Sequence, residues 1–271
     1  MKRIAQRGTV LALSCLALLG TALVSAGCAS KNKTTQVAGL TPEQLYQRGV
    51  ELLEEGKYLS SVETLQEIDW RFVGSNRNEL EPLVKLALAD ATFYQDTIIS
   101  LIDARQMYLD FVTLYGDHRL ASYAQFQGGM CSLKQVRSPA KDQTETFAAF
   151  RDLRQVLRRY PNSLYARAAQ DMIRRAEGSL AEHEFLIGRF YMKRKFYIAA
   201  QERFRNIIDR YPTYAQTEKV YFYLGRTLLL NDNEVEARIY LGKLISDFPD
   251  GNYVEQAQEA LNDVNASLGS P

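Results

Sequence analysis

The feature that most constrains this chain is a pattern that occurs twice, 37 residues apart. In each copy a Gly is followed by a small residue 12 positions later, by apolar residues 16 and 19 positions later, and by Pro 24 positions later. The copies are Gly188, Tyr191, Tyr197, Ala200, Phe204, Ile207, Tyr211, Pro212 and Gly225, Leu228, Glu234, Ala237, Leu241, Leu244, Phe248, Pro249. Gly and Ala allow two helices to cross closely, large residues fill the gap to the next pair, and Pro cannot continue a helix. The pattern therefore predicts stacked helical hairpins.

The same offsets recover three earlier units with less regularity. The first runs from Gly49 to Phe72, with Val73 where Pro is expected. In the third, the distance from Gly129 to the small residue Ala149 is 20 instead of 12, and the extra residues fall in 136–143, which has the composition of a loop. The second helices of units one to three are marked by Ser61, Leu65, Ile68; by Ala104, Tyr108, Phe111, Tyr115; and by Ala149, Leu153, Val156, Tyr160, Pro161.

This spacing is that of tetratricopeptide repeats. We predict an all-α tetratricopeptide-repeat solenoid of about five helical hairpins. Repeats one to three occupy 41–161, a connecting helix with the helical apolar period occupies 162–180, and repeats four and five occupy 181–262, before a tail at 263–271. Such an array predicts binding rather than catalysis, because its stacked units expose an extended concave surface.

The first 28 residues have the pattern of a targeting segment. Positive residues near the start precede an apolar run over 9–24, which ends in Ala26-Gly27-Cys28. About 16 apolar residues are short for a membrane-spanning helix, which needs about 20. We predict a signal peptide over 1–27 and a lipidated Cys28, followed by a polar tether to residue 40. Ordinary cleavage nearby, with Cys28 a plain thiol, is the alternative.

Composition leaves little material for catalysis. The chain has two His and three Cys, and of the Cys only Cys131 lies beyond the targeting segment, where a small buried core residue is expected. His183-Glu184 begins like a zinc-protease helix, but Ile187 stands where the second His is required. A net charge of +1 argues against a nucleic-acid binder. We expect no enzyme activity, no cofactor and no metal.

Charge is distributed unevenly along the chain. Residues 151–210 carry 14 Lys and Arg against seven Asp and Glu, whereas 28–150 and 211–271 have net charges of −4 and −5. A basic middle between acidic ends predicts a docking surface for an acidic partner. The alternative is that these helix faces are simply solvated by Arg.

Several runs resemble the BamD family, the lipoproteins of the outer-membrane β-barrel assembly machinery. They are 160–166 (YPNSLYA), 180–184 (LAEHE), 190–194 (FYMKR) and 199–204 (AAQERF), closing at Tyr211-Pro212. The resemblance covers the mature chain, is specific in 141–212, and departs from the family where Arg71-Phe72-Val73 replaces Arg-Tyr-Pro. It implies a lipid-anchored outer-membrane protein facing the periplasm, which binds the periplasmic domains of the barrel-forming subunit BamA, unfolded outer-membrane proteins and other lipoproteins of the machinery.

The resemblance and the repeat pattern together suggest two sets of contact residues. Repeats one to three are expected to receive extended client peptides, through Tyr46, Phe72, Tyr94, Tyr123 and Phe126, although most aromatic residues of the chain are expected to be core. The resemblance places a BamA-contacting Arg of the family at Arg203, and we assign Lys193 and Arg194 of the same basic segment to that partner. An intrachain pair of Arg203 with Asp209 or with neighbours of Glu202 is the alternative.

Two other classes of protein stay open at this point. One is a different periplasmic repeat lipoprotein, such as a Tol-associated or pilus-assembly factor. The other is an adaptor of a peptidoglycan enzyme. Tol-associated and pilus-assembly factors usually show more regular repeats of about 34 residues and lack the runs found in 141–212. The proteins that co-purify from solubilised outer membranes would separate all three interpretations.

Overall fold

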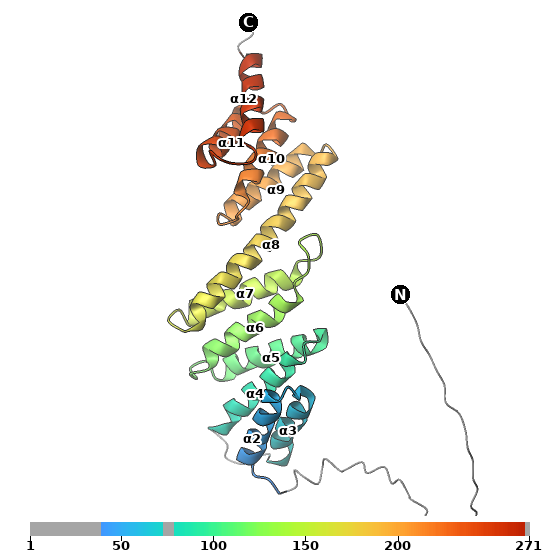
Figure 1. Cartoon of the computed structure of the whole chain (residues 1–271), viewed down its shortest axis with the longest axis vertical. Coiled ribbons are helices and arrows are strands. Elements are labelled where there is room, and N and C mark those ends of the chain that lie inside the picture. Colours follow the sequence, from blue (N-terminus) through green and yellow to red (C-terminus); the bar gives the residue numbers. More distant parts are fainter. Residues whose placement is uncertain (1–38, 73–78, 269–271) are drawn as a thin grey trace, which may run out of the picture. The chain divides into compact units, whose positions relative to one another are not determined.

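The computed structural model describes residues 39–72 and 79–268, which form helices joined by short connections (Figure 1). These residues contain eleven α-helices and no strand, which confirms the all-α prediction. The helices are α2 (Pro42–Glu54), α3 (Tyr58–Arg71), α4 (Leu80–Tyr94), α5 (Ile98–Leu114), α6 (Ala121–Gln135), α7 (Thr144–Arg159), α8 (Tyr165–Lys193), α9 (Tyr197–Arg210), α10 (Thr217–Leu229), α11 (Glu234–Asp247) and α12 (Val254–Leu268).

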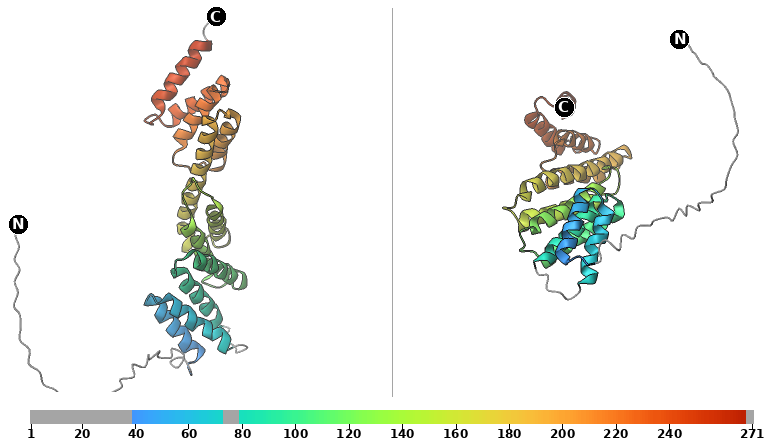
Figure 2. Two further views of the ribbon diagram at one scale, coloured as in Figure 1. Left: turned by 90° about the vertical axis from the view of Figure 1, so that its right-hand side faces the viewer. Right: turned by 60° about the horizontal axis from the view of Figure 1, so that its bottom comes forward.

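The helices from α2 to α11 pair into five hairpins, as the repeat pattern predicts. Each helix packs against the next one along the chain, and the views in Figures 1 and 2 show the hairpins stacked in chain order. We call the first helix of each pair (α2, α4, α6, α8, α10) the A helix and the second the B helix. Some A helices also contact the A helix of the neighbouring hairpin: α2 contacts α4, α6 contacts α8, and α8 contacts α10. The A helices of these hairpins therefore lie next to each other on one side of the stack.

A repeated contact inside the hairpins explains the recurring spacing of Gly and a large apolar residue. A Cβ added at Gly188 would lie 2.6 Å from the ring of Phe204, and one at Gly225 would lie 2.6 Å from Leu241. Gly49 meets Leu65 in the same way, and Gly129 meets Leu153 across the longer 136–143 loop. Only Gly fits these positions, because any side chain would overlap the residue that fills the A–B crossing.

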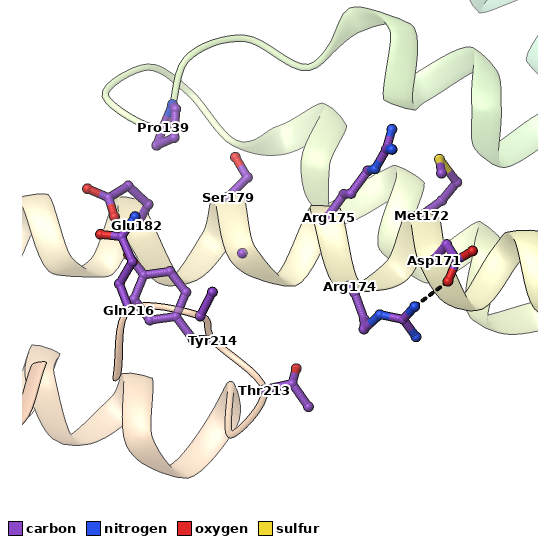
Figure 3. A pocket seen from close by; sticks show the side chains of 12 residues that line it. Pro139, Asp171, Met172, Arg174, Arg175, Ser179, Glu182, Thr213, Tyr214 and Gln216 are labelled. Atoms are coloured by element: carbon purple, nitrogen blue, oxygen red, sulfur yellow. Dashed lines mark hydrogen bonds and ion pairs between the residues drawn. The ribbon is translucent and has the colours of Figure 1, made fainter. Parts of the chain in front are cut away.

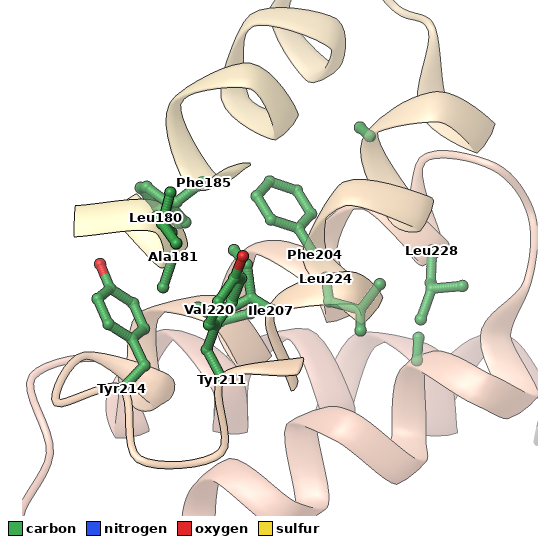
Figure 4. Close-up of a cluster of buried hydrophobic side chains, with 12 residues drawn as sticks. Leu180, Ala181, Phe185, Phe204, Ile207, Tyr211, Tyr214, Val220, Leu224 and Leu228 are labelled. Atoms are coloured by element: carbon green, nitrogen blue, oxygen red, sulfur yellow. The ribbon is translucent and has the colours of Figure 1, made fainter. Parts of the chain in front are cut away.

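Aromatic and aliphatic side chains form the core between successive hairpins. Figure 4 shows one such cluster, in which Leu180 and Phe185 of α8 lie near Phe204 of α9 and Val220 and Leu224 of α10. Cys131 is fully buried in the cluster of the second and third hairpins, as predicted, and burial raises the pKa of its thiol to about 12. This aromatic-rich packing confirms that most aromatic residues serve the core.

The structure differs from the predicted boundaries in two places. α8 runs unbroken over Tyr165–Lys193, so the predicted connecting helix at 162–180 and the A helix of the fourth hairpin are one helix. The predicted tail at 263–271 is helical as far as Leu268, because α12 packs its apolar side, including Ala257 and Val264, against the fifth hairpin. No Pro lies within 165–193 or 254–268, and Gly178 is accommodated inside α8, so both helices continue past the predicted boundaries.

The predicted signal peptide, Cys28 and residues 29–38 of the predicted tether lie outside the described residues. Within 39–72 and 79–268, no helix is long and apolar enough to cross a membrane.

Candidate protein-binding surfaces

A partly buried carboxylate lies among aromatic side chains of the first three hairpins. Asp90 on α4 accepts hydrogen bonds from the hydroxyl of Tyr108 on α5, at 2.5 Å, and from that of Tyr123 on α6, at 2.7 Å. Burial raises the pKa of the Asp90 carboxyl, and the two phenol hydrogen bonds only partly oppose this effect. Asp90 therefore joins helices of two hairpins through a single oxygen, Oδ1.

Four of the five predicted client residues lie on A helices near this carboxylate or next to its partners. Burial, and secondarily the charge of Asp90, raises the pKa of Tyr46 on α2. Tyr94, at the end of α4, is 47% exposed and stacks on Tyr58 at 5.6 Å between ring centroids. Phe126 on α6 stacks on Tyr165 at 5.5 Å. Tyr94 is the exposed member of the four, whereas Tyr46, Tyr123 and Phe126 are half-buried, the last two against core clusters. We call these four residues, Tyr46, Tyr94, Tyr123 and Phe126, the aromatic A-helix surface.

Phe72, the fifth predicted client residue, is placed differently. It follows the last turn of the B helix α3, and the guanidinium of Arg71 lies over its ring at 5.5 Å. The fold thus brings four of the five residues to A helices and leaves Phe72 at the end of a B helix. Sequence spacing alone did not separate these positions, because aromatic residues occur in both kinds of helix.

Arg203 on α9 forms an intrachain ion pair with Glu184 on α8. The guanidinium donates to the carboxylate at 3.0 Å, and the exposed fractions of the two side chains are 38% and 17%. The pKa of Arg203 is raised, chiefly by this hydrogen bond. Arg203 does pair within the chain, but with Glu184 instead of Asp209 or a neighbour of Glu202, since α8 and α9 are antiparallel and bring Glu184 opposite it.

The turn between α8 and α9 presents basic and aromatic side chains together. Lys193 and Arg194 are exposed, and the Arg194 guanidinium lies over the ring of Phe190 at 5.2 Å. Phe190 and Phe196 are 54% and 61% exposed. The sequence analysis did not assign these two aromatic residues to a contact surface. Their positions on either side of the Lys-Arg-Lys run at 193–195 could have identified them.

His183 and Glu184, the pair that begins like a zinc-protease helix, have structural partners. His183 Nδ1 lies 2.6 Å from the carbonyl oxygen of Pro139, and Glu184 binds Arg203. The pair thus connects α8 to the 136–143 loop and to α9.

The array of five hairpins defines a class of protein: a tetratricopeptide-repeat protein, whose stacked units form an extended surface. Comparison with known proteins narrows this class. The model of the YfiO family, described as outer membrane lipoprotein, matches residues 39–228, and a tetratricopeptide-repeat model matches residues 219–251. The chain belongs to this family of outer membrane lipoproteins.

Three relatives carry the name outer membrane protein assembly factor BamD. The protein from Caulobacter vibrioides is 31% identical over 88% of this chain and 77% of its own length. The relative from Rickettsia prowazekii is 28% identical over 90% of this chain and 94% of its own. That from Haemophilus influenzae is 25% identical over 81% of this chain and 87% of its own. The similarity spans nearly the whole helical array, so it includes both surfaces described above.

Proposed function

We propose that the protein is a non-enzymatic scaffold in the assembly of outer-membrane proteins, anchored to the outer membrane through a lipid on Cys28 and facing the periplasm. The observation that carries this proposal is the similarity, over nearly the whole array, to relatives named as outer membrane protein assembly factors. A repeat array suits this role because it offers separate surfaces to different partners while its core stays fixed.

The aromatic A-helix surface is the proposed site for unfolded clients. Tyr and Phe rings supply apolar area with few rotatable bonds, so they bind extended peptides at a small cost in conformational entropy. Tyr94 supports this role, since nearly half of its side chain stays exposed beside its stacking partner Tyr58. Phe72 stays a proposed client residue as well, at the edge of this region.

The fourth hairpin is the proposed site for the barrel-forming subunit. Arg203, Arg194 and Lys193 lie within the basic segment 151–210, which would attract acidic side chains of a partner. Phe190 and Phe196 add exposed apolar area at the same turn. Other lipoproteins of the machinery are further proposed partners.

Site-specific crosslinking tests the client site. A photoreactive amino acid at Tyr94 is expected to capture the C-terminal strands of unfolded barrel proteins. The same group at Phe147, an aromatic residue on the B helix α7 that is 48% exposed, is the matched control and is expected to capture few or none. Capture at Phe196 of the fourth hairpin, with none at Tyr94, would assign clients to the opposite half of the array and contradict the proposal.

A further inference from the structure

A cleft of about 760 Å³ opens beside the middle of α8, apart from Arg203 and from the aromatic A-helix surface. Figure 3 shows α8 crossing the site, with the 136–143 loop at Pro139 on one side and the 213–216 turn before α10 on the other. The residues of α8 that line it run from Asp171 to Glu182. At a rise of 1.5 Å per residue this length is about 16 Å, which matches about five residues of extended chain.

Hydrogen bonds hold both walls of the cleft against α8. On one side, Ser179 donates to Gln143 at 3.2 Å, and Gln143 in turn donates to three carbonyl groups of its own loop. On the other side, Glu182 accepts from the Tyr214 hydroxyl and from Lys219. Because these contacts already order the walls, a ligand entering the cleft would not have to immobilise them.

Gly178 lines the cleft, and its position in α8 is not explained by a close neighbour among the described residues; Gly242 on α11 is open in the same way but is not part of this cleft. A Cβ added at Gly178 would meet no atom within 4 Å, in contrast to Gly188 on the same helix, where it would overlap Phe204. Gly destabilises a helix interior relative to Ala, so an unoccupied position in the middle of α8 would favour almost any other residue. Gly at this position does allow another main chain to approach the helix backbone closely.

One positively charged side chain that lines the cleft, Arg175, has no acidic partner among the described residues. Arg174 pairs with Asp171, and Glu182 pairs with Lys219. Arg175 is exposed, and its guanidinium forms no ion pair or hydrogen bond with another described residue. An occupant with a carboxylate at this point would complete the pairing and could bind the guanidinium through two parallel hydrogen bonds.

We infer that this cleft is a docking site for an extended segment of a partner polypeptide that carries an acidic side chain. The segment crosses α8 with its main chain at Gly178 and its carboxylate at Arg175. The chain's own residues 29–38 do not fit, since their charged residues are Lys31 and Lys33. The inference rests on the proposed scaffold function and adds a second, separate partner surface to it.

Fluorescence anisotropy with two synthetic peptides tests the site on the full mature chain. Both are about ten residues long with small and apolar flanks, and they differ only in a central Glu or Lys. The Glu peptide is expected to bind the wild-type protein about tenfold or more tightly than the Lys peptide. Failure of the Glu peptide to bind at millimolar concentration would overturn the inference.

Two pairs of variants locate the binding. Gly178→Leu fills the floor of the cleft and is expected to weaken binding of the Glu peptide by about tenfold or more. Gly242→Leu on α11 is its control, because an added Cβ there also meets no atom within 4 Å, and it is expected to leave binding unchanged. Arg175→Glu is expected to reverse the preference between the peptides, whereas Arg238→Glu, at an exposed Arg of α11, should not.

Circular dichroism melting separates blocked binding from misfolding. Both Leu variants are expected to melt at or above the wild-type temperature, since Leu favours a helix more than Gly does. If Gly178→Leu folds and binds the Glu peptide as tightly as wild type, the cleft is not the docking site. The peptide assay contains no barrel protein, so its failure would leave the proposed scaffold function to be judged by its own crosslinking test.

Discussion

The guanidinium of Arg203 on α9 binds the carboxylate of Glu184 on α8 at 3.0 Å, and this contact ties together the two helices of the fourth hairpin. An Arg side chain has five N–H donors in a planar fork, so this bond does not use up its capacity. More than a third of the Arg203 side chain stays exposed, which leaves room for a second carboxylate from a partner. The intrachain pair would then hold the guanidinium in place before binding.

Arg203→Ala and Glu184→Gln separate the two roles of this pair. Each removes the ion pair, and each should lower the free energy of unfolding by about 1 kcal/mol or less, as expected for a partly exposed pair. Only Arg203→Ala removes the proposed partner contact, so it should weaken binding to the periplasmic domains of the barrel-forming subunit by about tenfold or more, whereas Glu184→Gln removes only the positioning of the guanidinium and should weaken binding less. Calorimetric titration with those purified domains, beside urea unfolding of each variant, measures both effects. Equal losses of affinity in the two variants would mean that the pair acts only on folding.

Gly188 and Gly178 lie on the same helix but are predicted to respond oppositely to Ala. Gly188→Ala places a methyl group 2.6 Å from Phe204 and should destabilise the fourth hairpin by about 1–3 kcal/mol, as overpacked cores do. Gly178→Ala meets no atom within 4 Å and should stabilise the protein by about 0.5–1 kcal/mol. Urea unfolding of the two variants provides the test. A destabilised Gly178→Ala would show that the middle of α8 has a constraint other than an unoccupied cleft.

Asp90 should make stability depend on pH. Burial raises its pKa above the ordinary value of 3.8, so the native state binds a proton that the unfolded chain has already released. This contribution to stability is fully present below the unfolded pKa and is lost as the pH rises through the native one. Asp90→Asn keeps an acceptor for Tyr108 and Tyr123 without a titrating charge, so its stability relative to wild type should increase from about pH 4 to about pH 7.

Urea unfolding across this pH range measures the effect of Asp90. Asp103→Asn, at an exposed carboxylate of α5, is the control. A relative stability of Asp90→Asn that is flat or falls with pH would mean that burial of the Asp90 carboxylate does not govern its ionisation.

Cys28→Ser tests the anchor. Two acyl chains give stable membrane binding where one chain is marginal, so the lipidated protein should sediment with outer membranes. The Ser variant should be found in the soluble periplasmic fraction or remain unprocessed. Fractionation together with intact-mass measurement makes the comparison, and an unchanged location and mass would rule out lipidation at this residue.

Most of the fold could be predicted from the repeat pattern, because each position of the pattern makes one defined packing contact. Gly49, Gly188 and Gly225 each lie against a residue 16 positions later, so a fixed sequence offset reported a fixed contact. The pattern could not show that α8 continues from Tyr165 to Lys193. Its positions mark contacts within one hairpin and do not mark a single helix that packs against both the third and the fourth hairpin's B helices.

The binding surfaces were less visible in the sequence because they depend on contacts between different helices. Glu184 lies 19 residues from Arg203, and Asp90 lies 33 residues from Tyr123, and neither pairing follows from a helical period. The exposure of aromatic side chains could not be predicted from the sequence either. Phe190 and Phe204 both lie in the fourth hairpin, yet Phe190 is 54% exposed and Phe204 is fully buried. Their difference arises from which side of the hairpin faces the next one.

Purification of the lipid-anchored chain from detergent-solubilised outer membranes, followed by mass spectrometry, tests the central claim most directly. If the protein is a scaffold for outer-membrane protein assembly, an outer-membrane barrel protein with soluble periplasmic domains should co-purify in stoichiometric amount, and Arg203→Glu should reduce its yield at equal expression. Co-purification of a peptidoglycan enzyme, a Tol component or a pilus protein in place of that barrel protein would contradict the account.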